Sequence, residues 1–554
     1  MTPNNEKLPE SIDLTHHLSA FSKARPTSPL KDLQKYWGKP GLISLAGGLP
    51  SPEVFPFSSV GANILLPDTF PARPSLSAEG PLSWLLNLFS SGKAKTTRIE
   101  IPRYANTPGG LDLATILQYT LASGHPKLKE FAKAMADRVY RPAYSDYTVL
   151  AHVGNTDGWV KAVMTLCNPG EGVLASVWTY PSALVAMRPY DIQAVPVAMD
   201  GQGMRSDALR ELLANWDAEE RGMARPHVMY TVPVGQNPTG AVSRPPPSAC
   251  IRLITASQTM EANRKKEIYD ICVEYDVVIV EDDPYYFLQE GPYYPRPYRA
   301  REHDKKDDSL QKYIDSLTPS YLRMDYQGRV IRLDTFSKTV APGCRMGWFT
   351  CNPKFAERLE RQAETSSQAP SGFSQGLVIS MIEQWGFDGF IRWTQGLANQ
   401  YTIRRDYIID RFAEEFDLRV GVVPEKSSID YFTGCSVYTA YPKERSRLMS
   451  EKATLEREAL LSFVPPTSGM FLWVKLHLER HPRYGSVPTK ELEKLLWIEL
   501  AEAGVLFGPG QIFAAEYDEI AAGHFRISFS NAEFNDLKKG ISIFAQVLVK
   551  FLRD

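Results

Sequence analysis

Between residues 148 and 351 the hydrophobic positions fall into short continuous runs, separated by segments with helical spacing. The runs have the length of β-strands: "TVLAHVG", "GVLASV", "HVMYTVP", "DVVIVED", "RVIRLD" and "RMGWFT". Intervening segments such as "TDGWVKAVMTLC" and "RKKEIYDICVEY" have the period of amphipathic helices. Continuous apolar strands joined by helices are typical of a mostly parallel sheet covered by helices on both faces. The pattern predicts an α/β fold for this part of the chain.

The flanking regions have different patterns. Residues 1–57 are Pro-rich and irregular, which predicts an N-terminal arm, and the Gly-, Ser- and Pro-rich stretch that follows, to about residue 115, predicts loop with short helices. Beyond about residue 386 a long helical stretch leads to "SGMFLWVKL" and "GHFRISFS", which have the pattern of strands. We therefore expect a large domain over residues 58–385 and a smaller α+β domain over residues 386–554.

One segment, Val242 to Thr259, does not fit the alternation. "VSRPPPSACIRLITASQT" places a Pro run between a turn and a helix and has no periodicity. An exposed loop insertion explains it, since such insertions cost little free energy. A retained intron translated in frame is the other explanation, because Val-Ser can be encoded by a splice-donor-like codon pair. Sequencing the mature transcript separates the two.

Composition narrows the class of protein. The chain has 554 residues, 43% hydrophobic and 23% charged, with a formal net charge of −2. This predicts a soluble protein of two or more domains and argues against nucleic acid or an anionic membrane as the main partner. The polar N-terminus lacks a signal peptide, and six scattered cysteines form no C-x-x-C pair, so we expect a cytoplasmic location. Nine histidines form no H-E-x-x-H motif, and no metal site is expected.

Polar residues follow most of the predicted strands. In an open parallel sheet, ligands bind beyond the carboxyl ends of the strands. Each of these motifs also has an ordinary structural explanation as a helix cap, a turn or core packing. The motifs are, in chain order, Gly154-Asn155-Thr156-Asp157-Gly158, Trp178-Thr179-Tyr180-Pro181, Asn237-Pro238-Thr239-Gly240, Glu281-Asp282-Asp283-Pro284-Tyr285-Tyr286, and Lys338 with Arg345.

Together the motifs supply one chemistry. Small residues at the start of a helix, with an arginine nearby, suit a phosphate group. An amine can form a Schiff base with an aldehyde, and a carboxylate can keep a pyridine nitrogen protonated. A phosphate loop, an aromatic face, a carboxylate and a lysine at one sheet edge are the set that pyridoxal phosphate requires.

The chain resembles the fold-type-I pyridoxal-phosphate aminotransferases of class I/II, and within them the fungal aromatic amino acid and 2-aminoadipate/kynurenine aminotransferases. The resemblance extends from about residue 20 to the end, except for the segment 242–259. It rests on motifs that occur in the family's order: "ISLAGGLPSPEVFPF", "NPTG", "EDDPYY", "TFSK" and "SFVPPTSGMFLW". It implies the fold of this family and a homodimer.

The resemblance also implies roles for individual residues. Lys338 would hold the cofactor and move protons, Asp282 would pair with the pyridinium nitrogen, and Tyr180 would stack on its ring. Asn237 and Tyr285 would hydrogen-bond its phenolic oxygen. Arg526 would bind the substrate α-carboxylate, and Gly48 and Leu49 would close over the substrate. The expected phosphate ligands are Asn155, Thr156, Thr335, Ser337, Arg345 and, from the neighbouring subunit, Tyr119. Asn155-Thr156 departs from the Ser-Gln often found in relatives.

The expected reaction is transfer of the amino group of an aromatic L-amino acid to a 2-oxo acid such as 2-oxoglutarate. Lys31 falls where relatives that prefer aminoadipate or kynurenine carry an arginine, and a lysine grips a second carboxylate less rigidly than a bidentate arginine. A 2-aminoadipate or kynurenine aminotransferase is the alternative. A pyridoxal-phosphate lyase would use the same lysine and carboxylate. A DNA-binding regulator would need a helix-turn-helix module, which the arm lacks.

Overall fold

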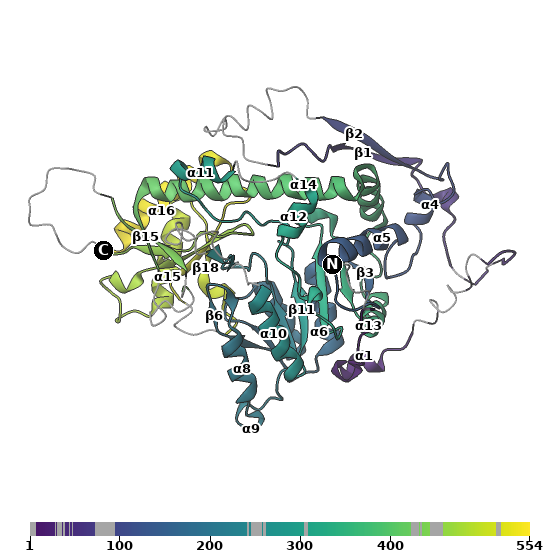
Figure 1. Cartoon of the computed structure of the whole chain (residues 1–554), viewed down its shortest axis with the longest axis horizontal. Coiled ribbons are helices and arrows are strands. Elements are labelled where there is room, and N and C mark those ends of the chain that lie inside the picture. Colours follow the sequence, from purple (N-terminus) through teal and green to yellow (C-terminus); the bar gives the residue numbers. More distant parts are fainter. Residues whose placement is uncertain are drawn as a thin grey trace, which may run out of the picture.

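The computed structural model describes most of the chain and shows a large and a small layered part joined by one long helix (Figure 1). The described residues are 7–27, 48–72, 95–240, 262–303, 309–422, 435–443, 458–516 and 522–553, with a few isolated positions between them. Lys31 and most of the segment 242–259 lie outside them. In the described part, no helix has both the length and the apolar character needed to cross a membrane.

The large part is built on a seven-stranded sheet, which confirms the predicted α/β architecture. Each predicted apolar run forms one of its strands, and all pairs are parallel except the two made by β13, which lies antiparallel to both neighbours. The strands, in spatial order, are β3 (Thr148–His152), β13 (Gly347–Cys351), β12 (Val330–Thr335), β11 (Val278–Asp282), β8 (Val228–Thr231), β4 (Gly172–Ser176) and β5 (Gln193–Val197).

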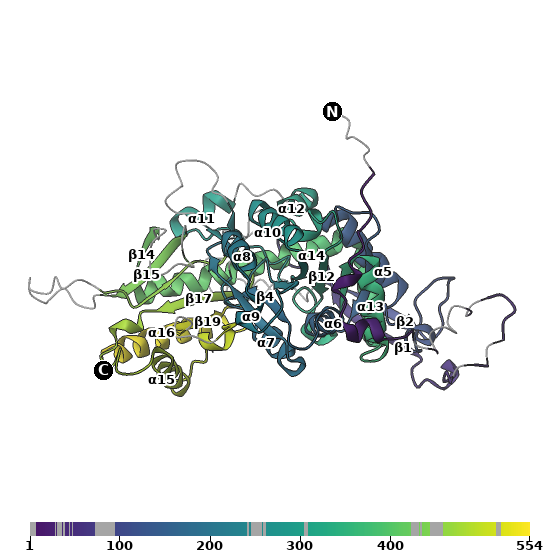
Figure 2. The same ribbon diagram turned by 90° about the horizontal axis from the view of Figure 1, so that it is seen from below.

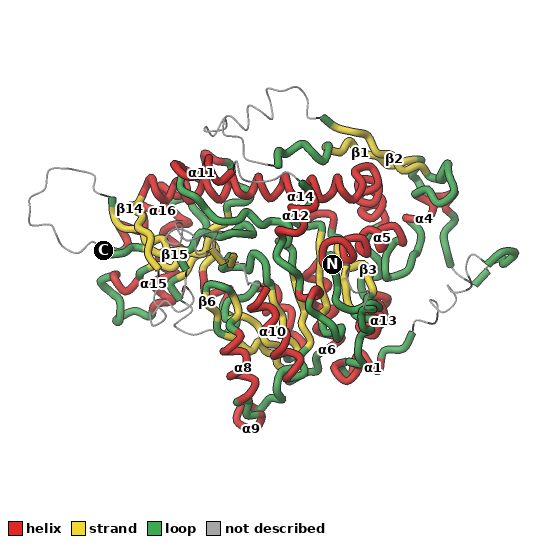
Figure 3. The backbone as a smooth tube through the Cα atoms, in the orientation of Figure 1, coloured by secondary structure: helices red, strands yellow, loops and turns green. Residues whose placement is uncertain are grey.

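Helices cover both faces of this sheet (Figure 3). On one face Val278 and Val280 of β11 share a core with apolar side chains of α6, α7 and α13, and on the other Ile279 packs with side chains of α5, α8 and α10. Both faces are buried, which explains why the strands are apolar without alternation. The helices between residues 126 and 364 are α5 (Pro126–Met135), α6 (Asn155–Leu166), α7 (Pro181–Met187), α8 (Ser206–Ala214), α9 (Ala218–Arg221), α10 (Ala262–Glu274), α11 (Arg296–His303), α12 (Leu310–Ser316) and α13 (Pro353–Glu364). Of these, α11 lies against the later helix α14 (Gly372–Glu415).

The small part has a six-stranded antiparallel sheet backed by two helices, α15 (Thr489–Glu502) and α16 (Phe534–Phe551). The two motifs predicted as strands form β17 and β19, which pair with each other. The strands, in spatial order, are β14 (Phe416–Val422), β15 (Ser436–Pro442), β16 (Leu461–Phe463), β17 (Phe471–Leu476), β19 (His524–Ser528) and β18 (Gly508–Pro509).

Helix α14 (Gly372–Glu415) links the two parts, and Figure 2 shows it spanning the molecule. Ile379 and Ile382 near its start pack in the core of the large sheet, and Ile408 and Phe412 near its end pack with the small sheet. Gly386 has φ of 69°, which breaks the helix at the predicted domain boundary. The division into domains itself stays a prediction.

The prediction of loop and short helices for the residues after the arm is partly wrong. Ser59–Leu65 (β1) and Thr96–Pro102 (β2) pair along their whole length as an antiparallel ribbon, followed by the short helix α4 (Leu113–Ile116). In β2 the isoleucines 99 and 101 are buried, whereas their neighbours are exposed or half-buried. This period-2 signal is short, and the many Gly, Ser and Pro residues around it hide it.

The N-terminal segment packs onto the large sheet rather than extending away from it. Leu14 and Leu18, on either side of the 3-10 helix η1 (Thr15–His17), are buried in its core, and helix α1 (Ala20–Ala24) follows. The backbone N–H of Ile12 donates to Gln327 O at 3.0 Å. The predicted arm of residues 1–57 therefore includes a stretch that belongs structurally to the large part.

The remaining elements are short. Four residues of the segment 242–259 are described, and they form two paired strands, β9 (Ser243–Arg244) and β10 (Ser257–Gln258). The other short elements are η2 (Pro52–Val54), the π-helical turn η3 (Ala136–Tyr140), η4 (Arg188–Tyr190), β6 (Met199–Asp200), β7 (Gly203–Met204), η5 (Tyr321–Arg323), η6 (Pro342–Cys344), η8 (Leu478–Arg480) and η9 (Gly510–Phe513).

Candidate active site

The three consecutive carboxylates at the end of β11 point to different faces of the sheet. Side chains alternate along a strand, so Glu281 and Asp283 share one face and Asp282 occupies the other. All three are buried, with exposed fractions of 0, 2 and 5% for Glu281, Asp283 and Asp282. Burial on this scale requires compensation for each charge. The two faces provide it in different ways.

On the face that carries Glu281 and Asp283, which we call the rear face, a buried arginine compensates the negative charges. Arg332 of β12 lies opposite Glu281 in the parallel register and is fully buried. Its guanidinium lies 3.3 Å from Glu281, 3.0 Å from Asp283 and 2.9 Å from Asp334, measured between nitrogen and oxygen. It also lies 3.9 Å from the ring centroid of Tyr140, whose hydroxyl donates to Asp334 at 2.8 Å. Arg332 thus forms ion pairs with all three carboxylates on this face.

On the opposite face, which we call the front face, Asp282 is hydrogen-bonded by neutral groups. Tyr230 Oη and Asn155 Nδ2 each donate to its carboxylate at 2.6 Å. Burial raises the pKa of Asp282, and these two hydrogen bonds oppose that rise. Among the described residues no lysine, arginine or histidine forms an ion pair with it. A buried carboxylate that is hydrogen-bonded only by neutral groups can form an ion pair with a cationic group of a ligand.

Asn155 has a different partner from the predicted one. The sequence places its side chain at a phosphate, together with Thr156. In the structure its amide donates to Asp282 and, at 3.2 Å, to Leu333 O. Asn155 is the first residue of α6 and is 8% exposed, so its side chain turns inward to the sheet. The backbone N–H groups at this helix start and the exposed Thr156 remain available for a phosphate.

The start of α6 and the turn after β12 meet around Arg345. Its Nη2 donates to Val153 O at 3.0 Å, and a Cβ on Gly154, whose φ is 106°, would clash with the guanidinium. Thr335 and Ser337 lie beside it with their hydroxyl oxygens 2.8 Å apart, and Arg345 Nη1 lies 3.5 Å from Ser337 Oγ. Hydroxyls, a helix N-terminus and an exposed guanidinium thus gather at one place, as the sequence predicts for a phosphate site.

Lys338 lies one turn beyond Thr335, at the carboxyl end of β12. It is half-buried, and its pKa is lowered first by burial and then by the charges of Arg526 and Arg345. No ion pair to a carboxylate is present for it within the described ranges. Burial and neighbouring cations favour the neutral form of a lysine amine, which is the nucleophilic and basic form.

Arg526 of β19 is the residue through which the small part contributes to the site. Its Nη1 donates to Asn237 Oδ1 at 2.8 Å, and Asn237 hydrogen-bonds the hydroxyl of Tyr285. The guanidinium carbon lies 4.2 Å from the ring centroid of Phe471 and 4.7 Å from that of Phe513. The structure therefore joins three predicted residues and adds two phenylalanines that sequence analysis does not single out.

The other predicted residues are less closely tied to this group. Tyr180 is the N-cap residue directly before α7 and is half-buried. It lies close enough to Arg526 to raise the pKa of that arginine, which burial lowers more strongly. Tyr119 and Leu49 are 64 and 42% exposed, and Gly48 has open space around it. In the single chain, the arm contacts its own large part: Gln118 Nε2 donates to Pro50 O at 2.8 Å. The roles of Tyr180, Thr156, Tyr119, Gly48 and Leu49 stay predictions.

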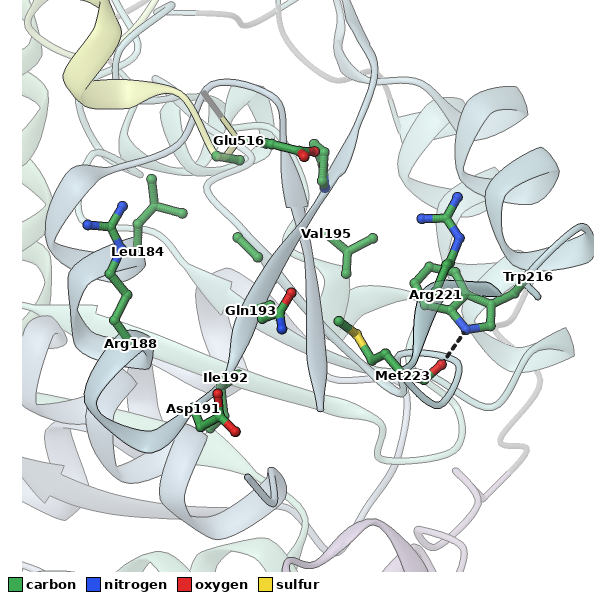
Figure 4. A pocket seen from close by; sticks show the side chains of 13 residues that line it. Leu184, Arg188, Asp191, Ile192, Gln193, Val195, Trp216, Arg221, Met223 and Glu516 are labelled. Carbon is green, nitrogen blue, oxygen red and sulfur yellow. Dashed lines mark hydrogen bonds between the residues drawn. The ribbon is translucent and has the colours of Figure 1, made fainter. Parts of the chain in front are cut away.

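A cavity of about 480 Å³ lies elsewhere, beside the edge strand β5 (Figure 4). Arg188, Trp216, Arg221 and Glu516 are among the residues that line it, and Trp216 Nε1 donates to Met223 O at 3.0 Å. None of the predicted site residues lines this cavity. The candidate site is thus identified by the chemistry and placement of its residues and not by the size of a cavity.

Comparison with known proteins agrees with this arrangement. The family model described as aminotransferase class I and II matches residues 103–248 and 259–543, and the interruption falls inside the predicted insertion. An aromatic amino acid aminotransferase of Schizosaccharomyces pombe is 34% identical over 541 residues, which cover 97% of this chain and 98% of that protein. An L-tyrosine:2-oxoglutarate aminotransferase of Serpula lacrymans is 32% identical over 523 residues, covering 92 and 85% of the two chains.

Solved structures show the same likeness. The crystal structure of the aminotransferase Aro8 from Candida albicans superposes with a TM-score of 0.78 at 32% identity, covering 99% of this chain and 100% of that one. The aromatic aminotransferase Aro9 from the same species gives a TM-score of 0.74 at 25% identity, covering 98 and 99%. The match therefore includes both the sheet that carries the lysine and the small part that carries Arg526. The chain belongs to the class I and II aminotransferase family.

Proposed function

We propose that this aminotransferase uses pyridoxal 5′-phosphate to move the amino group of an aromatic L-amino acid, Phe, Tyr or Trp, to a 2-oxo acid such as 2-oxoglutarate. The observation that carries the proposal is the imbalance of charge at the front edge of the sheet. At this edge Arg345 and Arg526 lie close enough to Lys338 to lower its pKa, whereas Asp282, buried at the end of β11, is bound by neutral donors. A phosphorylated cofactor and a carboxylate substrate supply the missing negative charge.

The residues present fit pyridoxal phosphate. The helix start at Asn155, the hydroxyls of Thr335 and Ser337 and the guanidinium of Arg345 would hold its phosphate. Gly154 leaves room for that guanidinium, since a side chain there would collide with it. Asp282 would face the pyridine nitrogen and keep it protonated, and Tyr285 and Asn237 would hold the phenolic oxygen. When bound, the cofactor supplies the aldehyde and the electron sink that transamination needs.

Lys338 would perform the proton transfer. Burial and the neighbouring arginines lower the pKa of its amine, which favours the neutral Nζ that would take the proton from the substrate α-carbon. Arg526 would hold the α-carboxylate through the donors that Asn237 leaves free. A guanidinium is planar and binds a carboxylate through two parallel hydrogen bonds, which fixes the α-carbon relative to Lys338.

The aromatic preference is supported by the relatives named above. The alternative, a 2-aminoadipate or kynurenine aminotransferase, is favoured by the resemblance to the kynurenine/alpha-aminoadipate aminotransferase of Rattus norvegicus, which is 26% identical over 531 residues. Lys31, the residue expected to bear on this choice, lies outside the described residues. Substrate measurements must decide.

We further propose that the enzyme is a cytoplasmic homodimer. In the single chain Ile43, Leu45 and Tyr119 are 84, 93 and 64% exposed, so the arm and the segment before α5 present apolar surface for a second copy. The described cysteines are all free, which agrees with a reducing compartment. Gel filtration with light scattering would test the dimer.

A panel of amino donors with 2-oxoglutarate tests the function. We expect kcat/KM to be higher for Phe, Tyr and Trp than for 2-aminoadipate and kynurenine, with one glutamate formed for each donor consumed. A higher value for 2-aminoadipate or kynurenine would support the alternative. Release of ammonia without glutamate would show a lyase and contradict the proposal.

A further inference from the structure

Glu493, on helix α15 of the small part, is a carboxylate buried without a cationic partner. Its exposed fraction is 0%, and the structure shows no ion pair for it in the described ranges. Instead it accepts backbone hydrogen bonds. Gln511 N donates to Oε1 at 3.3 Å, and Gly523 N and His524 N donate to Oε2 at 2.6 and 3.3 Å. One side chain thus ties together two segments that are distant in sequence.

The first of these segments is the 3-10 helix η9 (Gly510–Phe513). Gly510 approaches the second segment so closely that a Cβ there would lie 2.6 Å from His524 Cβ. Phe513, at the end of η9, is 1% exposed and faces Arg526. The carbonyl of Phe513 also accepts from Thr179 N at 2.8 Å, directly before Tyr180. The position of Phe513 therefore depends on the turn that Glu493 anchors.

The second segment begins strand β19, and Arg526 follows His524 by two residues. The guanidinium of Arg526 lies between the rings of Phe471 and Phe513, and Asn237 binds one edge. Stacking between two rings fixes the plane of a guanidinium. Because bidentate binding of a carboxylate requires the two groups to be coplanar, this plane decides how well Arg526 binds a substrate.

We propose that Glu493 is a positioning residue of the substrate-carboxylate site: it anchors η9 and the start of β19, and so sets the plane in which Phe513 and Phe471 hold Arg526. The inference rests on the proposed role of Arg526 and deepens it. Glu493 does not touch the substrate. A purely structural anchor would change the stability of the small part alone, whereas a positioning residue also changes the affinity for every ligand with a carboxylate at this place.

The substitution Glu493→Gln tests this, because it keeps the size of the side chain and replaces one acceptor oxygen with an N–H₂ group that faces backbone N–H donors. We expect KM to rise about tenfold or more for both the amino donor and 2-oxoglutarate, as for loss of a charged hydrogen bond. The value of kcat should stay within about twofold and the bound pyridoxal phosphate per chain should be unchanged. The dissociation constant of 3-phenylpropionate, a carboxylate without an amino group, should rise by the same factor in calorimetry.

Glu491→Gln is the matched control, since Glu491 lies on the same helix, 47% of its side chain is exposed and its carboxylate lies 3.8 Å from the Lys494 amine. It should leave KM and 3-phenylpropionate binding unchanged. Phe513→Leu removes one ring from Arg526 while Glu493 stays, and should raise KM by a similar factor. The double variant of Glu493→Gln and Phe513→Leu should bind 3-phenylpropionate no more weakly than the single variant with the lower affinity, because both substitutions act through one contact.

Unchanged KM and 3-phenylpropionate affinity in Glu493→Gln would overturn the inference. A rise in KM accompanied by comparable decreases in kcat and in cofactor content would overturn it as well. If Glu493→Gln does not fold, Phe513→Leu decides, and unchanged affinity there overturns the inference equally. Arg526→Lys distinguishes the proposed role of Arg526 from the proposed role of Glu493. If that variant binds 3-phenylpropionate as the wild type does, the proposed role of Arg526 is wrong, whereas a negative result confined to Glu493 leaves that role intact.

Discussion

The two faces of the large sheet at β11 and β12 treat charge in opposite ways. Behind the sheet, Arg332 lies within 3.3 Å of Glu281, Asp283 and Asp334, and all four side chains are buried. Lys265, also buried, donates to Pro319 O at 2.8 Å, and the charges of Glu281 and Asp283 oppose the lowering of its pKa by burial. Every charge in this rear cluster faces an opposite one.

In front of the sheet the cations outnumber the carboxylates. Arg526 and Arg345 both lower the pKa of Lys338, and Asp282 is bound by a tyrosine and an asparagine. Strand β11 thus supplies ion-paired carboxylates on one face and, on the other, a carboxylate bound by neutral donors. A charge that the protein pairs with its own residues holds the fold, and a charge left without a protein partner awaits a ligand.

Removal of the reactive amine should have the largest effect on activity. In Lys338→Ala, kcat should fall by more than about 10⁴-fold, because both the attachment of the cofactor and the proton transfer need this amine. The melting temperature should change little, since within the described residues the amine has no hydrogen bond or ion pair to lose. Borohydride reduction followed by mass spectrometry should find the cofactor on Lys338 of the wild type. Transamination that survives in the variant would contradict the assignment.

Arginines on the two faces should respond differently to the same substitution. Arg332→Met leaves three buried carboxylates without their cation and should lower the free energy of unfolding by about 3–5 kcal/mol. Arg345→Met, at an exposed position, should change it by less than about 0.5 kcal/mol but weaken binding of pyridoxal phosphate. Urea unfolding and cofactor titration measure the two effects. Equal loss of stability in both variants would remove the distinction between the faces.

The neighbouring carboxylates Asp282 and Asp283 offer a finer test. Asp282→Asn should reduce kcat by about 10²–10³-fold, as for loss of a group that stabilises charge in the transition state, with little change in stability. Asp283→Asn should lower stability and leave kcat per folded, cofactor-loaded chain close to that of the wild type. Denaturant unfolding and turnover of both variants should show opposite patterns, and matching patterns would refute the comparison.

The sequence predicts the front face better than the rear. Asp282 and Lys338 are singled out because they lie at or beyond the ends of apolar strands, at the edge where ligands bind, and Arg345 because it follows Lys338 by seven residues. Arg332 lies inside the apolar run "RVIRLD", and its partners depend on the register that places it opposite Glu281. Register is a property of two strands together, so one strand's pattern does not contain it.

The contacts of Tyr230 and Asn155 with Asp282 are not predicted from the sequence, for a related reason. Tyr230 stands in the apolar run "HVMYTVP", where a tyrosine is indistinguishable from core packing until its hydroxyl is seen 2.6 Å from Asp282. Asn155 is correctly placed at a helix start, but the rotamer that turns it to the carboxylate is decided by the packing of α6 on β11 and β12. Patterns in the chain locate backbone positions, and tertiary contacts choose side-chain directions.

The smallest expected effect is on acid stability and comes from the N-terminal segment. Its buried histidine, His17, is paired less completely than the rear charges and more completely than the front ones. His17 of η1 is 3% exposed, with its Nε2 3.1 Å from Asp276 and its Nδ1 3.0 Å from Nδ1 of His227. Asp276 also accepts from Arg329 at 2.7 Å and from His16, and His227 lies 3.2 Å from Glu171. The histidine is therefore buried among groups that are themselves partly paired.

Burial lowers the pKa of His17 to about 4, more than the charge of Asp276 raises it. Because the unfolded chain takes up this proton near pH 6.5, the free energy of unfolding should fall as the pH drops from 6.5 to 4, by up to about 3 kcal/mol. Asp276, whose pKa is lowered overall, contributes below that window. His17→Gln should lose this part of the acid sensitivity, and His16→Gln, at a side chain 58% exposed, should keep it. Urea unfolding at intervals between pH 4 and 7 would measure the difference, and identical slopes for the wild type and His17→Gln would show that the proton is taken up elsewhere.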